Sequence, residues 1–281
     1  MAFNTAYDLE SLVVNTKAAT VYTAFESSLF LGGNLIPQVQ IPAGSTTAQI
    51  PLMGSVTAQK LTSADPDNPA GDFTDLTITD TKKTVEADIY AARHVLRDMG
   101  GIDPQETGRV LGHAIQTAFD KDVMAVLGNL TGQEIAGSAG TNDLTVAEIQ
   151  SAVGTIRGNG ETGPLVGVVG AGAYAALMSN IGSQAFAGGE FQNSAMRNGF
   201  FGKIAGVDMY VSSYLDATNT GQTNAKAAVF GADAMRIAMF KNVDIEIARR
   251  PAAVGFDVVA SLHAGVGLVD ANRGVIIKDA S

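Results

Sequence analysis

The spacing of apolar residues changes several times along the chain, and the changes divide it into segments. Helical spacing is kept by the apolar side chains of the first segment, Leu12, Val21, Phe25 and Leu29. This spacing predicts a helix from about Asp8 to Leu31 that ends at two glycines, Gly32-Gly33. We interpret residues 1–38 as an N-terminal arm.

Residues 39–93 alternate between apolar and polar positions, which is typical of strands. Prolines at positions 42 and 51 favour an edge strand or a free hairpin, because proline has no backbone N–H to donate to the hydrogen bonds of a central strand. The middle of the segment, "KLTSADPDNPAGDF", has the composition of a loop. We predict a long two-stranded hairpin with a polar tip. Since an isolated hairpin is marginally stable in water, either the rest of the chain or a neighbouring copy must cover it.

Residues 94–141 contain the strongest helix signal. Asp103 is a good N-cap, Pro104 suits the first helical position, and Glu106 stands where a capping-box acid belongs. Apolar residues continue at helical spacing to Leu130, so we predict a helix over 103–130. At 1.5 Å per residue it would be about 40 Å long, which is more than a small domain needs.

Residues 142–228 are predicted to form a separate α/β unit. The order is a helix capped by Thr145 with Glu148 at the capping-box position, a buried strand "PLVGVVG", and the helix "AGAYAALMSNI". "NGFFGKIAGVDMYVSSYL" follows, in which an Ala-Gly turn precedes the alternating strand from Val207 to Val211. Residues 229–281 are rich in strand patterns, and we expect this closing segment to return to the long helix.

Composition excludes several classes of protein. The 281 residues are 46% hydrophobic and 16% charged, which indicates a globular chain. The net charge of −10 and the absence of long basic runs argue against a protein that grips nucleic acid. With no cysteine, disulfides, thiolate catalysis and zinc fingers are excluded. No signal peptide or membrane span is predicted, so we expect a soluble protein made inside the cell.

The best enzymatic lead is "VVGAGAYA", where Gly170, Gly172 and Ala175 satisfy the dinucleotide pattern G-x-G-x-x-A after a strand. Glu190 lies 20 positions after Gly170, where a ribose-binding acid would be expected. That acid should end a second apolar strand, and the intervening sequence contains none. We therefore interpret the motif as a tight strand-to-helix turn.

Other chemistry is poorly supported. The histidines, His94, His113 and His263, are far apart and lack metal-ligand spacing. Acids at the hairpin tip, Asp65, Asp67 and Asp72, lack the terminal Glu of a calcium loop. We predict no catalytic residue, no metal and no cofactor.

The order of these segments, with "NGFFGKIAGVDMYVSSYL", "GPLVGVVGAGAYAALM" and "AVFGADAMRIAMFKNVDIEIARRP", resembles the major capsid proteins of tailed bacteriophages, which share the Hong Kong 97 fold. The resemblance implies an α+β chain with an N-arm (1–38), an extended β-hairpin loop (39–93) and a peripheral domain (94–141) that holds the spine helix (103–130). The axial domain (142–228) and closing strands (229–281) complete it.

The implied function is that of a shell subunit. The protein would assemble with itself as hexamers and pentamers into an icosahedral virion capsid that encloses double-stranded DNA, after synthesis in the host bacterial cytoplasm. A separate scaffolding protein, a portal and a decoration protein are the implied partners, and no membrane is involved. Inter-subunit contacts are expected at seven residues of the arm and the hairpin: Phe25, Phe30, Lys60, Asp65, Asp67, Lys82 and Lys83.

Two alternatives remain open at this point. An encapsulin-like nanocompartment shares the fold but encloses protein instead of DNA. A nucleotide-binding enzyme would form a small oligomer and bind a dinucleotide through Gly170 and Gly172.

Overall fold

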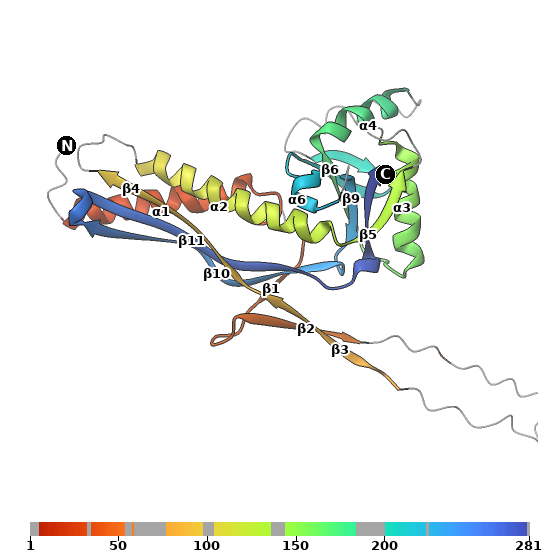
Figure 1. Ribbon diagram of the computed structural model, residues 1–281, viewed down its shortest axis with the longest axis horizontal. Helices are drawn as coiled ribbons and strands as arrows, with labels where there is room; N and C mark the ends of the chain where they lie inside the picture. The colour runs from red at the N-terminus through yellow and green to blue at the C-terminus, as the bar shows by residue number, and fades with distance from the viewer. Residues whose placement is uncertain are drawn as a thin grey trace, which may run out of the picture.

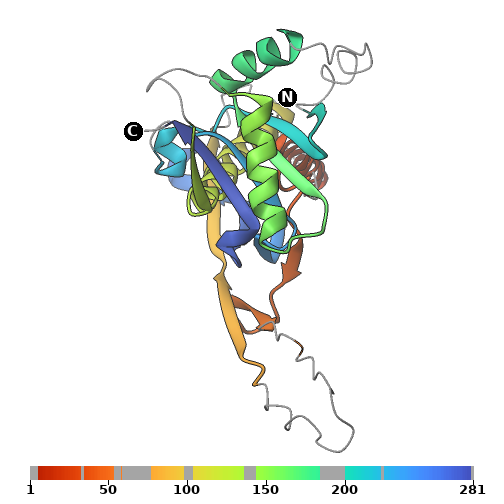
Figure 2. The same ribbon diagram turned by 90° about the vertical axis from the view of Figure 1, so that its right-hand side faces the viewer.

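The computed structural model describes residues 6–32, 35–53, 58, 77–97, 104–135, 144–183, 200–222 and 225–279. An elongated body of two helices on a sheet carries an α/β unit at one end, and a hairpin projects from its middle (Figure 1). Figure 2 shows the hairpin extending well beyond the rest of the described chain.

The long helix α2 (Pro104–Leu127) forms the axis of the body. Its buried side chains recur every three or four residues and form one apolar stripe: Leu111, Ile115, Phe119, Val123 and Leu127. Each fully buried side chain of this kind contributes about 1.5–3 kcal/mol. Because α2 spans Pro104–Leu127, the predicted helix over 103–130 is confirmed to within a few residues.

Beneath the helices lies a four-stranded sheet in the order β1-β10-β11-β4. Its strands are β1 (Gln38–Gln40), β10 (Met235–Arg250), β11 (Gly255–Leu268) and β4 (Asp88–Arg97). Val258, Ala260 and Leu262 of β11 alternate inward and are fully buried against the helices. The helix α1 (Ala6–Ser27) lies beside α2 on the same side of the sheet.

Helices α1 and α2 approach each other so closely that only glycine fits at two positions of α2. A Cβ at Gly108 would lie 2.7 Å from the Thr16 carbonyl oxygen, and one at Gly112 would lie 2.6 Å from that of Thr20. Gly108 meets the earlier turn of α1 and Gly112 the later one, so the two helices run in the same direction. Both threonines are fully buried in this contact.

The helix α1 ends earlier than predicted. The predicted end was Leu31, whereas the helix stops at Ser27. The hydroxyl of Ser28 accepts hydrogen bonds from the backbone N–H groups of Phe30 (3.3 Å) and Leu31 (3.0 Å), which turns the chain out of the helix. A serine hydroxyl competes in this way with helical hydrogen bonding.

A six-stranded sheet forms the core of the α/β unit, in the order β5-β12-β9-β6-β8-β7. Its strands are β5 (Thr131–Ile135), β12 (Gly274–Asp279), β9 (Ala225–Gly231), β6 (Leu165–Gly170), β8 (Val207–Ser212) and β7 (Phe200–Ile204). Three helices accompany it, α3 (Val146–Gly158), α4 (Ala171–Ser183) and the short α6 (Ala217–Thr220). Short 3-10 turns, Pro251–Ala253 and Ala271–Arg273, precede β11 and β12.

Several local predictions for this unit are confirmed. Thr145 precedes α3, and its backbone N–H donates to the Glu148 carboxylate at 2.7 Å, as a capping box requires. The strand and helix around Gly170 are present as β6 and α4. Ala205 and Gly206 both have positive φ, 52° and 83°, and form the two-residue turn between β7 and β8.

The closing segment 229–281 differs from its prediction. β10 and β11 run along the body with the long helix, as expected. β12, however, pairs with β5 and β9 and so belongs to the sheet of the α/β unit. Its side chains Val275, Ile276 and Ile277 are buried there. No local pattern distinguishes β12 from β11, because both are apolar strands and the partners of β12, β5 and β9, lie far away in sequence.

The predicted hairpin is shorter than expected. Its strands are β2 (Thr47–Met53) and β3 (Asp80–Glu86), which pair antiparallel. Residues after 87 belong to β4, which pairs with β11 in the body, although the prediction extended the loop to residue 93. The hairpin tip lies outside the described residues.

We expect Gly112→Ala to destabilise the unassembled subunit. Alanine favours the helix by about 0.5–1 kcal/mol, but the added methyl overlaps the Thr20 carbonyl, and such overpacking costs about 1–3 kcal/mol. A net loss of about 1 kcal/mol in the free energy of unfolding should appear in urea denaturation. Gly154→Ala in α3 is the matched control, because its Cβ would meet nothing within 4 Å. A gain in both variants would contradict the close packing.

Candidate assembly surfaces

The described residues contain no group of three or more histidine or acidic side chains that could hold a metal ion. The three histidines lie apart, and the Nδ1 atom of His113 is 2.9 Å from Oε1 of Gln116, its neighbour on the same helix. His263 lies against the ring of Phe240, with 6.1 Å between the ring centroids. These contacts are structural. None of the described helices is long and apolar enough to cross a membrane.

The dinucleotide-like motif is a packing feature. A Cβ at Gly170 would lie 2.8 Å from the carbonyl oxygen of Leu215 and 3.4 Å from that of Lys226. The space beside this glycine is therefore filled by the chain's own backbone. Glu190 lies outside the described residues. The interpretation as a tight strand-to-helix turn agrees with this geometry.

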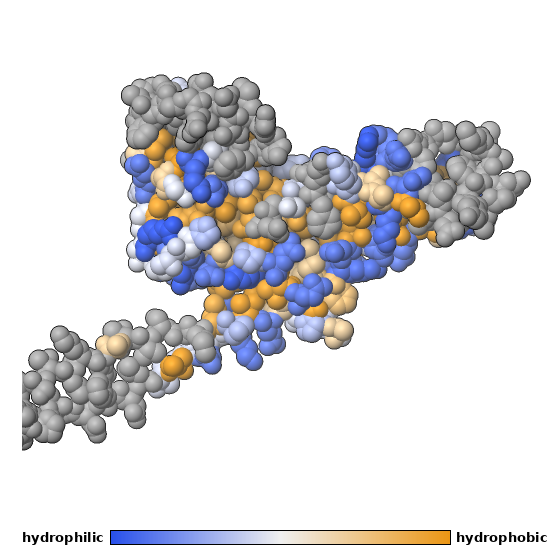
Figure 3. All heavy atoms as spheres, turned by 180° about the vertical axis from the view of Figure 1, so that it is seen from behind, coloured by the Kyte–Doolittle hydropathy of each residue, from blue (hydrophilic) through white to orange (hydrophobic). Residues whose placement is uncertain are grey.

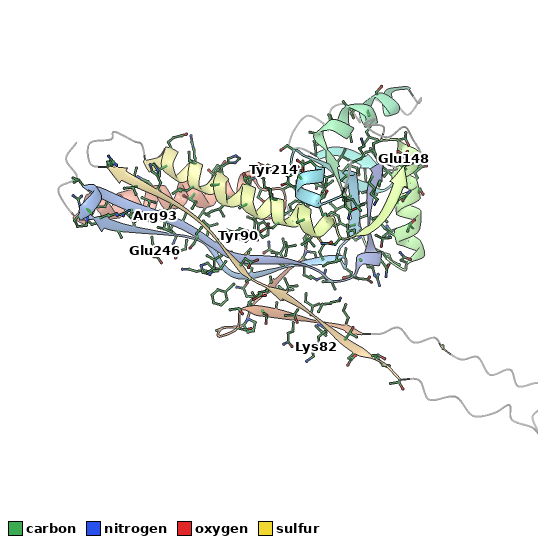
Figure 4. All side chains as sticks on the ribbon, in the orientation of Figure 1. Lys82, Tyr90, Arg93, Glu148, Tyr214 and Glu246 are labelled. Carbon is green, nitrogen blue, oxygen red and sulfur yellow. The ribbon has the colours of Figure 1, made fainter. Side chains whose placement is uncertain are left out.

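Strand β3 of the hairpin is highly exposed. Only Val85 of β3 is buried, and the other six residues of the strand, Lys82 and Lys83 among them, are exposed. Ile78, just before β3, is 58% exposed although it is apolar. Lys82 lies on the projecting ribbon, far from Tyr214 and Glu148 in the rest of the chain (Figure 4). A two-stranded ribbon of this kind is marginal on its own, so its surface is available for another molecule.

The other predicted contact residues are placed as follows. Phe30 is fully buried in the core of its own chain, and whether it also meets a neighbouring copy stays a prediction. The side chain of Phe25, in α1, lies outside the described part. Lys60, Asp65 and Asp67 also lie outside it.

The end of α1 is fastened to α2 by a buried carboxylate. Asp120, only 3% exposed, accepts hydrogen bonds from the Ser28 hydroxyl (2.8 Å) and from Nε2 of Gln116 (2.9 Å). Burial raises the pKa of Asp120 above its ordinary value, although these hydrogen bonds act in the opposite direction. The acid therefore holds the turn at Ser28 in place through hydrogen bonds.

A second link joins α1 to the sheet. Nζ of Lys17 lies 2.9 Å from Oδ1 of Asp244, and Nζ of Lys241 lies 2.7 Å from the other carboxylate oxygen. The two ammonium groups hold the pKa of Asp244 well below its usual range, Lys241 contributing most. Both lysines are about half exposed, so each pair adds little stability and serves mainly to orient the helix.

Exposed apolar side chains on the body were not anticipated from the sequence. The large ones in the described part are Val14, Tyr22, Ile89, Val110, Phe240 and Val254. Figure 3 shows apolar residues (orange) on the body and around the root of the hairpin. Ile89 and Phe240 line a pocket of about 120 Å³ at that root. Sequence reasoning missed Ile89 and Phe240 because each falls within a regular strand pattern, which predicts a core position.

Val254 is unusual in its backbone as well as its exposure. It is 62% exposed and has φ 47° and ψ 59°, the left-handed conformation, at the turn between β10 and β11. A β-branched residue rarely adopts this conformation, since it places Cβ against the backbone. This position is both strained and apolar.

Comparisons with known proteins support a single fold. No protein-family model matches the chain, and no curated protein matches it in sequence. The capsid structure of the cyanophage P-SCSP1u superposes with a TM-score of 0.66 at 16% identity, over 87% of this chain and 86% of that chain. The asymmetric unit of the bacteriophage PhiM1 mature capsid also gives a TM-score of 0.66 at 16% identity, over 90% and 87%.

A virus-like particle from Pyrococcus furiosus matches over a larger share of both chains. It covers 94% of this chain and 98% of its own, with a TM-score of 0.62 at 9% identity. At these identities the likeness establishes the fold. The chain therefore has the Hong Kong 97-like α+β fold that its sequence resembled, and the predicted fold class is confirmed.

The buried carboxyl of Asp120 predicts a pH dependence of stability. Because its pKa is raised in the folded chain, the charged form costs stability, and the cost grows as pH rises above about 4 until the folded-state pKa is passed. We therefore compare the free energy of unfolding of the native chain with that of Asp120→Asn. The difference, native minus variant, should fall over this pH interval and then stay constant. Urea denaturation of both proteins between pH 4 and 7 measures the difference. Parallel curves for the two proteins would contradict a raised pKa.

Val254→Asn should stabilise the unassembled subunit, because asparagine tolerates the left-handed conformation. We expect a gain of about 1 kcal/mol in the free energy of unfolding, from the cost of that conformation. Val110→Asn is the control, since Val110 is 61% exposed but lies within α2. There asparagine has no such strain to relieve, and no gain is expected. Equal effects of the two substitutions on thermal unfolding would argue against strain at Val254.

Proposed function

We propose that this chain is the major capsid protein of a tailed bacteriophage. It assembles as hexamers and pentamers into an icosahedral shell that encloses double-stranded DNA. The observation that carries the proposal is an exposed hairpin on a chain whose fold matches phage capsid chains over 87–90% of its length.

The uncovered hairpin supports assembly through identical copies. A ribbon that exposes six of the seven residues of β3 is marginal alone, so it needs a surface to lie on. In a closed shell each subunit both offers such a ribbon and receives one, because contacts between identical copies repeat under symmetry. Seven residues of the arm and hairpin remain the proposed contact residues: Phe25, Phe30, Lys60, Asp65, Asp67, Lys82 and Lys83.

The division of labour within the subunit follows the fold. We assign 1–38 as the N-arm, the hairpin region within 39–93 as the extended loop, and the body around α2 as the peripheral domain. The unit around β6, α3 and α4 is the axial domain, to which β5 and β12 also belong. Many modest contacts of this kind add up to a stable shell through their number.

The net charge of the chain determines how the proposed shell interacts with the DNA inside it. The net charge is −10 and no run of basic residues in the sequence is longer than two, whereas phosphate binding needs clustered Lys and Arg. We therefore propose that DNA is enclosed without sequence-specific binding and is repelled, on average, by the wall. A separate scaffolding protein, a portal and possible decoration proteins are the expected partners in the virion, after synthesis in the host bacterial cytoplasm. The role is structural, without catalysis.

A second candidate is a shell that encloses protein, as in encapsulin-like compartments. The match to the Pyrococcus furiosus virus-like particle, over 98% of that chain, favours it enough to test. Both candidates predict shells, and they differ in the cargo. Expression in the native host followed by nuclease treatment and chemical analysis of the particles separates DNA from protein contents.

Electron microscopy of the purified protein tests the proposal directly. We expect hollow shells tens of nanometres across, built of hexamers and pentamers, when the chain is expressed with its scaffold. Small oligomers under every assembly condition would overturn the proposal.

The hairpin lysines provide a specific test. We expect Lys82→Ala with Lys83→Ala to reduce shell yield at least tenfold, while the thermal unfolding of the unassembled subunit stays within 1–2 °C, because both side chains are exposed. Lys82→Arg with Lys83→Arg is the control that keeps the charge. Normal assembly of the alanine variant would remove these residues from the interface.

A further inference from the structure

On the side of β3, the hairpin joins the body through one residue. Strands β3 and β4 are consecutive and are separated only by Ala87. Glu86 still pairs with Thr47 in the hairpin, whereas Asp88 already pairs with Ala264 of β11 in the body. The N–H of Ala87 donates to the carbonyl of Thr46 at 3.0 Å. The change of partner is completed within a single residue, so no linker residues remain on this side of the junction.

Two glycines of β11 lie directly against this junction. A Cβ at Gly265 would be 1.8 Å from the carbonyl oxygen of Glu86. One at Gly267 would be 2.5 Å and 3.0 Å from the two methyl carbons of Val85. No side chain larger than hydrogen fits at either position with the hairpin in this direction. Neither glycine has a positive φ, so space is the reason for their small size.

The incoming strand is fastened as well. β1 pairs with β10, and the N–H of Ile41 donates to the carbonyl of Met239 at 2.9 Å. A small core then forms at the root of the hairpin from Ile41, Ala48, Val85 and Ala238, each at most 4% exposed. Both strands that enter the hairpin are thus hydrogen-bonded to the body, and apolar packing fills the angle between them.

We infer that Gly265 and Gly267 are positioning residues for assembly, which hold the hairpin in one direction by letting its root pack directly on β11. The glycines of this root therefore act as fitted contacts and not as flexible joints. The geometry is a property of the single chain. Its consequence for shells rests on the proposed function.

The hairpin acts as a lever on this root. The seven residues of β3 span about 20 Å at about 3.3 Å per residue. A rotation of roughly 10° at the root therefore moves the outer end by about 3–4 Å. Gaps of about 1 Å already forfeit much of a packing contact, so a small error at the root would misplace the hairpin on its neighbour.

The test measures the direction of the hairpin in the unassembled chain. Because the chain has no cysteine, Lys82→Cys on the hairpin and Glu246→Cys on β10 allow selective spin labelling at two exposed positions (Figure 4). Pulsed electron resonance then gives the distance distribution between the labels. We expect a single narrow distribution in the otherwise native chain. A broad distribution would show a freely moving hairpin and overturn the inference.

Gly267→Ala is the decisive variant, because its clash is with side-chain methyls and not with backbone. We expect the label distance to shift by about 2–3 Å or to split, because Lys82 lies about 13 Å from the root and a rotation of roughly 10° there moves it by that amount. Adding Val85→Ala removes the struck methyls and should restore the native distance, which a merely destabilising substitution would not allow. Gly154→Ala, in open space on α3, should change nothing. An unshifted distance in Gly267→Ala overturns the inference.

Assembly of the same variant then tests the positioning role. We expect Gly267→Ala to give shells of altered diameter or incomplete shells, and the Val85→Ala double variant to move back toward the native size. Native shells despite a shifted label distance would overturn the positioning role. If the native chain forms no shell at all, the proposed function fails, while the label distances still decide whether the root is rigid.

Discussion

Backbone contact between α1 and α2 is the constraint on which the arrangement of the body depends. Gly108 and Gly112 let α2 rest on the carbonyl groups of Thr16 and Thr20, so α1 lies at a fixed height along the longer helix. Asp120 accepts a hydrogen bond from the hydroxyl of Ser28, which directly follows α1, about two helical turns further along α2. Three contacts between two helices that run in the same direction leave one register.

The position of the hairpin follows from that register. After Ser28 the chain turns and enters β1, which pairs with β10 beside the body. The other strand of the hairpin continues into β4 and pairs with β11. Because β10 and β11 pair with each other along most of their length, both ends of the hairpin are anchored to the same pair of strands. Helix packing and hairpin direction are therefore parts of a single arrangement.

Apolar packing is distributed unevenly over the described chain. The body and the α/β unit bury large apolar clusters of their own, whereas the described part of the hairpin shares a small core at its root. A two-stranded ribbon with so little packing is marginally stable alone. The packing at its base therefore holds the described part of the hairpin in place.

Local sequence patterns determined the elements. The 3.6-residue spacing and the proline and acid at its start predicted α2, and Thr145 with Glu148 marked the start of α3. The α/β unit and the hairpin were also readable, because periodicity and turn residues act over a few positions. Only the tertiary structure assigned β12 to the sheet of the α/β unit and buried Phe30 in the core.

The same limit applies to the root of the hairpin. Gly267 must be small because of Val85, which lies 182 positions earlier in the chain. In the sequence this glycine looks like one of many turn or joint residues. Periodicity reports which face of an element is apolar, but the space available at one position is decided by partners that only folding brings together. The sequence by itself therefore determined the elements and the fold class, and the tertiary structure decided where their surfaces meet.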